Sequence, residues 1–116
     1  MTDPETARAA MDAAWHRIAD GLVHGEADVE YGRMMSSPAV TLGGKVFAFY
    51  CANNLMTGIG ARLGRDFDVD GLGLTDWSVL SPFKSKPPLK DWIVVGPADM
   101  ARWSEVARLA LKQMRG

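Results

Sequence analysis

The segment spanning residues 37–59, SPAVTLGGKVFAFYCANNLMTGI, constrains the fold of this chain more than any other part of the sequence. It predicts three consecutive antiparallel strands, near residues 38–43, 45–51 and 54–59. Two-residue hairpin turns need residues that tolerate positive φ, and the pairs Gly43-Gly44 and Asn53-Asn54 supply them between the strands. The middle strand is apolar on both faces over residues 46–50, which is typical of an inner strand.

A first amphipathic helix is predicted over residues 4–24. Thr2 or Asp3 is expected to cap it, and Gly25 is expected to end it in the left-handed conformation. Its apolar residues recur at spacings of three and four, as in a helix with one buried face: Ala7, Met11, Ala14, Trp15, Ile18 and Leu22. A short edge strand is predicted near residues 29–33.

The C-terminal half predicts further strands near residues 77–80 and 89–95, and a helix over residues 99–114 with Asp99 as its cap. One helical turn is expected at residues 60–64. Residues 65–75 (RDFDVDGLGLT) are rich in Asp and Gly and predict a mobile loop, and residues 84–88 (KSKPP) predict a basic connector. The whole order predicts an α+β two-layer sandwich with one antiparallel sheet of about five strands between N- and C-terminal helices.

Composition places few further limits on this chain. Its 116 residues have the length of a single domain, predicted to span residues 1–116, and 47% hydrophobic with 23% charged residues is ordinary for a globular protein. The first residues lack the basic start and unbroken apolar run of a secretory signal, and no window resembles a membrane span. A single cysteine, Cys51, fits a reducing compartment, so we expect a cytoplasmic protein.

Charge is distributed unevenly along the chain. Residues 1–30 carry two basic and seven acidic side chains, whereas residues 31–116 carry eleven basic and seven acidic ones. Such an asymmetry can mark a basic face for polyanions, or a protomer that docks its acidic helix on a basic neighbour. Ordinary solvated helices are the simplest interpretation.

Three motifs within residues 33–116 resemble the YjbR/MmcQ-like and TfoX N-terminal-domain group of small bacterial proteins. They are Arg33-Met34-Met35 followed by Ser36-Ser37-Pro38, the GGKVFAF strand of residues 43–49, and the KPPLKDWIVV segment of residues 86–95 that leads to a helix bearing Trp103. The resemblance implies a helix, three strands, a helix, two strands and a final helix.

Functionally, the resemblance implies little beyond a link of YjbR-type members to DNA binding and of the TfoX domain to a competence regulator. This sequence also departs from the group's pattern. Thr57-Gly58 stands where relatives usually place a lysine, and Ser36 replaces a glycine. If that lysine contacts an anion in relatives, the same contact is not expected here.

No motif predicts catalysis or a metal site. His16 and His24 lie two helical turns apart, too far to share a metal ion, and Cys51 is expected to be a buried thiol. The residues Asp66, Asp68 and Asp70 resemble the start of a calcium loop, but Trp77 occupies the position of the required glutamate. With no P-loop, nucleophile–base motif or dinucleotide fingerprint, we predict a protein that is not an enzyme and needs no cofactor.

Two hypotheses about binding remain. The first is association with another protein chain or with a second copy, through the methionines or through an open sheet edge. The alternative is a weak DNA-binding accessory or regulatory role. Its candidate contacts are the basic residues Arg62, Arg65, Lys84, Lys86 and Lys90.

Overall fold

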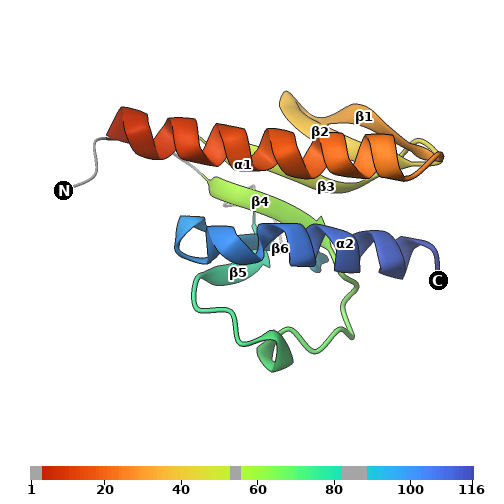
Figure 1. The fold of residues 1–116 in the computed structure, drawn as a ribbon. Coiled ribbons are helices and arrows are strands. Elements are labelled where there is room, and N and C mark those ends of the chain that lie inside the picture. The colour runs from red at the N-terminus through yellow and green to blue at the C-terminus, as the bar shows by residue number, and fades with distance from the viewer. Residues whose placement is uncertain (1–3, 53–55, 82–88) are drawn as a thin grey trace.

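The computed structural model describes residues 4–52, 56–81 and 89–116 of the chain (Figure 1). Its elements are α1 (Pro4–Gly25), β1 (Val29–Met34), β2 (Ser37–Leu42), β3 (Lys45–Ala52), β4 (Thr57–Arg62), η1 (Asp70–Leu72), β5 (Trp77–Leu80), β6 (Leu89–Val95), η2 (Pro97–Arg102) and α2 (Trp103–Met114). The strands form one antiparallel sheet in the order β1-β2-β3-β4-β6-β5. The predicted α+β two-layer sandwich is confirmed, with six strands instead of about five, and β3 is an inner strand as expected.

The main hydrophobic core lies between the two helices and one face of the sheet. Trp15 of α1 stacks on Tyr50 of β3 with ring centroids 6.0 Å apart, and Trp103 of α2 meets the same tyrosine at 6.0 Å. Trp103 is fully buried, and its indole N–H donates to the carbonyl of Gly96 over 3.0 Å. These contacts attach both helices to the same strand.

The opposite face of the sheet carries a smaller cluster to which neither helix contributes. Its buried members are Ala39, Phe49, Cys51 and Leu80, and Met34, Val46, Met56, Trp92 and Val94 pack around them. Phe49 lies 5.5 Å from Trp92 between ring centroids, and a Cβ on Gly60 would stand only 2.2 Å from the Phe49 ring. Gly60 therefore makes room for Phe49 on the neighbouring strand.

A β-bulge explains how β3 serves both clusters. The register pairs Val40 with Ala48 but Thr41 with Val46, so Phe47 is an extra residue on β3. Phe47 and Ala48 both belong to the main core, whereas Val46 packs against the second cluster. The bulge therefore directs two successive side chains toward the helices.

Some predicted boundaries are wrong around β4. The third strand covers Thr57–Arg62 instead of residues 54–59, and the helical turn expected at residues 60–64 is absent from this fully described stretch. Ala61 pairs with Ala48 on one side and with Ile93 on the other, so two ladders hold this segment extended. The predicted Asn53-Asn54 turn, the Thr2 or Asp3 cap and the whole basic connector at residues 84–88 lie outside the described residues.

Two details of the helices also differ from expectation. Gly25 is the last residue of α1 but does not have positive φ, so the predicted left-handed cap is wrong. The last helix begins as the 3-10 helix η2, and α2 itself starts at Trp103. The helix that the family resemblance implies between the third strand and the next pair is also absent, since residues 63–76 contain only η1.

We expect Phe49→Ala to lower the free energy of unfolding by about 3–5 kcal/mol, because the ring is 1% exposed and the space it leaves cannot be refilled. Denaturant titration followed by tryptophan fluorescence measures this change. The matched control Val79→Ala, at a position 39% exposed, should change it by no more than about 0.5 kcal/mol. Equal losses in the two variants would contradict the placement of Phe49 in the second cluster.

Candidate functional site

The outer edge of β1 is the clearest candidate for a binding surface. Among the described residues β1 pairs with β2 alone, in a register that runs from Val29 opposite Leu42 to Met34 opposite Ser37. The two-residue turn makes Met34 and Ser37 a hydrogen-bonded pair, and such pairs alternate along an antiparallel ladder. The backbone N–H and C=O groups of Tyr31 and Arg33 therefore face away from β2.

Exposed apolar side chains accompany this edge. Tyr31 is 55% exposed and Met35, in the turn, is 64% exposed; within the described ranges these are the two most exposed large hydrophobic residues. The Tyr31 hydroxyl donates a hydrogen bond to the Asp20 carboxylate of α1, which raises the pKa of Tyr31. The edge thus combines outward backbone groups, an aromatic ring and a carboxylate.

Met35 adds a conformational feature at the tip of the same hairpin. Its φ is 57°, and among the described residues it is the only non-glycine residue with positive φ. Left-handed backbone is unfavourable for a long side chain by about 1–2 kcal/mol. The opposite edge of the sheet, at β5, is shorter and has an irregular register between Val79 and Leu80.

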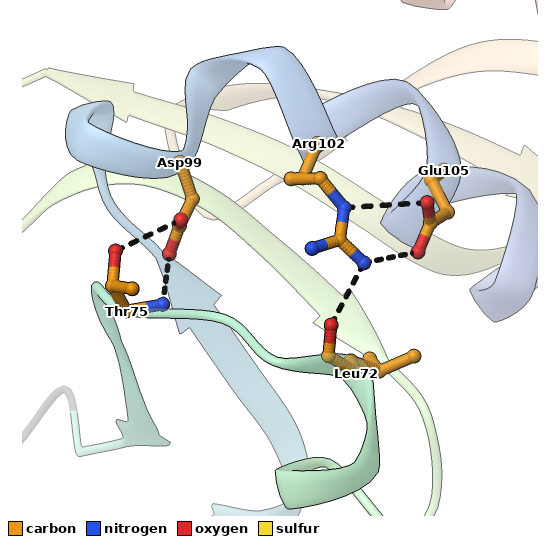
Figure 2. A network of polar contacts seen from close by, with 5 residues as sticks. All are labelled: Leu72, Thr75, Asp99, Arg102 and Glu105. Atoms are coloured by element: carbon orange, nitrogen blue, oxygen red, sulfur yellow. Dashed lines mark hydrogen bonds and ion pairs between the residues drawn. The ribbon is translucent and has the colours of Figure 1, made fainter.

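The Asp-rich loop after β4 is attached to η2, as Figure 2 shows. Buried Asp99 does not cap the last helix; its carboxylate accepts hydrogen bonds from Thr75 N–H at 2.8 Å, Thr75 O–H at 3.1 Å and Asp76 N–H at 2.6 Å. Arg102 donates to the Leu72 carbonyl over 2.9 Å. The loop is therefore fixed to η2 at two points, through the Leu72 carbonyl and through Thr75 with Asp76.

The chemistry of the Asp99 contact is that of a structural carboxylate. Burial alone would raise its pKa, but the hydrogen bonds from Asp76 and Thr75 hold the pKa of Asp99 below its ordinary value. Arg102 also pairs with Glu105 at 2.6 Å, which lowers the pKa of Glu105. Its donors, Thr75 and Asp76, belong to the end of the loop, so this cluster fastens the loop to η2.

The predicted basic patch is only partly assembled by the described residues. Arg62 and Arg65 follow one another around the end of β4, and Lys90 lies exposed at the start of the adjacent β6. Asp91 stands among them, 3.6 Å from Arg65, and Arg62 is directed to the Met114 sulfur at 3.2 Å. Lys84 and Lys86 lie outside the described residues, so DNA binding through this patch stays a prediction.

The fold brings together a polar cleft that sequence spacing could not reveal. A hollow of about 400 Å³ lies between α1 and the end of β3, and His16 and Cys51 both line it. Asp12 accepts from the Tyr50 hydroxyl at 2.6 Å and from Arg8 Nε at 3.0 Å, while the Cys51 sulfur is 3.0 Å from the Ser37 hydroxyl. Burial and Asp12 raise the pKa of Tyr50, which keeps it a hydrogen-bond donor.

The remaining sequence candidates have simple roles. Cys51 is buried, and His16 and His24 are exposed, as expected. Asp68 accepts a hydrogen bond from the Gly71 N–H at 3.2 Å and so closes a local turn. In the part of the chain that the structure describes, no three His, Cys, Asp or Glu side chains are placed to hold a metal ion, and no helix there is long and apolar enough to cross a membrane.

Comparisons with protein-family models, with curated proteins and with solved structures found no match to this chain. The resemblance to the YjbR/MmcQ-like and TfoX N-terminal-domain group therefore remains a prediction from the motifs. Arguments about function have to start from the surfaces described above.

Asp99 predicts a defined pH dependence of stability. Because its pKa is lowered in the folded protein, its contribution is present at neutral pH and is lost as pH falls through the folded-state pKa. The difference in melting temperature between the native protein and Asp99→Asn should thus be largest near neutral pH and shrink below about pH 4. Thermal melts from acid to neutral pH check this, with Asp66→Asn on the exposed start of the loop as control; a difference independent of pH would contradict it.

Proposed function

We propose that this chain is a non-enzymatic association module that forms a homodimer by pairing the β1 edges of two copies. The observation that carries this proposal is the six-residue open edge, at which the backbone groups of Tyr31 and Arg33 face outward. An unpaired edge of this length is a template for another strand, and the main-chain hydrogen bonds it offers provide affinity without a deep pocket.

A second copy fits this edge because the strand is complementary to itself. Two β1 strands can pair in an antiparallel manner about a two-fold axis normal to the sheet, and side chains of facing residues then point to the same face of the sheet. Because side chains alternate between the faces along a strand, two facing residues have both odd or both even numbers, and the two numbers add up to an even number. One such register places Gly32 against the partner's Gly32 and Tyr31 against the partner's Arg33. Glycine at the axis leaves the two backbones free to approach.

The charged side chains favour the register with Gly32 at the axis over the adjacent symmetric registers. Tyr31 already lies against Asp20, so the partner's Arg33 meets both an aromatic ring and a carboxylate, twice in the dimer. Cation–π contacts at exposed sites stabilise by about 0.5–1 kcal/mol each. One adjacent symmetric register would instead place the partner's Arg33 opposite Val29, which is 2% exposed and belongs to the main core. The other would place Arg33 opposite the partner's Arg33, where like charges repel.

The proposed dimer is tested by measuring the molecular mass of the protein in solution. Sedimentation velocity between about 10 µM and 1 mM should give a species of twice the 12.6 kDa protomer mass at the upper concentrations. Tyr31→Lys removes the ring and sets a cation against the partner's Arg33, so this variant should stay monomeric. Its control, Val79→Lys at the opposite edge of the sheet, should dimerise as the native chain does.

A native chain that remains monomeric at the highest concentration contradicts the proposal. So does a dimer that Tyr31→Lys leaves intact, because the association would then use another surface. Far-ultraviolet circular dichroism of both lysine variants checks that the sheet is retained.

A further inference from the structure

A second surface of interest is a groove between the two helices. Residues of α1 form one wall and residues of η2 and α2 form the other, and together they enclose about 330 Å³. Ile18 and Met100 are half-buried in its floor and pack against the main core, while Arg17, Ser104 and Arg108 lie along its sides. The groove therefore has an apolar base and a polar, cationic rim.

The two arginines of this groove differ from the others. Each remaining arginine has a partner: Asp12 for Arg8, the Ser36 carbonyl for Arg33, Met114 for Arg62, Asp91 for Arg65, Glu105 for Arg102, and Asp28 for Arg115. Within the described residues, Arg17 and Arg108 make no hydrogen bond or ion pair. The chain thus places its two unpaired guanidinium groups on the same concave surface.

The acidic side chains close to them in sequence are already engaged. Asp20, three residues after Arg17, accepts the hydrogen bond of the Tyr31 hydroxyl. Glu105, three residues before Arg108, accepts two hydrogen bonds from Arg102, at 2.6 Å and 3.3 Å. Among the described residues, neither carboxylate forms an ion pair with Arg17 or Arg108.

Gly21 shows where the Arg108 side chain lies. A Cβ built on Gly21 of α1 would stand 4.0 Å from Nη2 of Arg108, so the guanidinium extends from α2 across to the first helix. The absence of a side chain at Gly21 leaves that position open. Five N–H donors in a planar fork are thereby held at the rim, where a carboxylate or phosphate could accept two of them.

We propose that this groove binds a small amphiphilic anion, in which a carboxylate or phosphate head is joined to a short alkyl chain. Arg17 and Arg108 hold the head, with the Ser104 hydroxyl as a further donor, and the chain lies on Ile18 and Met100. An anion between the two arginines also removes their mutual repulsion. The residues that line this groove are different from those that pair in the proposed dimer.

The experiment is a titration of ¹⁵N-labelled protein followed by amide chemical shifts, with octanoate and octyl phosphate below their micellar concentrations. Both ligands share the head-and-tail chemistry, and the tighter one identifies the preferred head. Saturable shifts centred on Ser104 and Ile18 are expected, whereas acetate and octanol, which lack the tail or the charge, should bind at least about tenfold more weakly.

Two variants and a matched control complete the test. Arg17→Gln and Arg108→Gln should each weaken binding by about tenfold or more, because each removes a charge-assisted contact. Lys45→Gln removes one exposed cation from the distant β2–β3 turn and should leave the affinity unchanged. The proposal is overturned if neither anion saturates the site, if octanol binds as tightly as octanoate, or if Lys45→Gln weakens binding as much as the arginine variants do.

Discussion

Tyr50 is the residue on which the arrangement of the two layers depends. Its ring stacks on Trp15 of α1 with an interplanar angle of 14° and meets Trp103 of α2 at 55°, so a single side chain of β3 contacts both helices. Its hydroxyl also donates to Asp12 on α1 over 2.6 Å. Because both helices are held over one face by these contacts, they lie side by side, which creates the groove between them.

The charge asymmetry of the sequence is partly compensated at one place in the folded protein. Arg115, at the end of α2, lies 2.7 Å from Asp28 and 3.6 Å from Glu26, so the basic C-terminus neutralises the acidic turn between α1 and β1. Arg8 pairs with Asp12 within α1. These pairs are exposed and each contributes little to stability. Among the described residues, they leave Arg17 and Arg108 as the arginines without a partner.

Periodicity and turn chemistry were enough to predict most of the fold. Local sequence was sufficient for the Gly43-Gly44 turn, the inner strand β3 and the apolar stripes of both helices. The glycine pair indicates positive φ in a turn, and the spacing of apolar residues indicates which faces are buried. The course of β4 did not follow, since Gly58 and Gly60 have no side chain to carry the alternating pattern. Gly60 is required by the ring of Phe49 on the next strand, which is a contact between strands and not a local preference.

The functional surfaces were harder to predict for the same reason. Asp99 satisfies the rules for a helix cap, yet its partners Thr75 and Asp76 lie more than twenty residues earlier in the chain. The sequence alone does not show which basic side chains pair with a carboxylate. Arg65, for example, belongs to the predicted basic patch near β4, but in the structure it pairs with Asp91. Arg17 and Arg108 belong to different helices, and only the packing of those helices shows that they share a groove.

Met35 connects the stability of the β1–β2 hairpin to its proposed role. Glycine or asparagine would adopt the left-handed backbone at this position at lower cost, so a methionine with φ of 57° makes the isolated hairpin less stable than it could be. The side chain recovers little of that cost within the protomer, since it is 64% exposed. In the proposed dimer with Gly32 at the axis, the tip of each hairpin lies near the start of the partner's β1, and the flexible thioether of Met35 would cover that end of the edge. The proposed dimer would therefore compensate the unfavourable backbone at the tip, which the protomer alone does not.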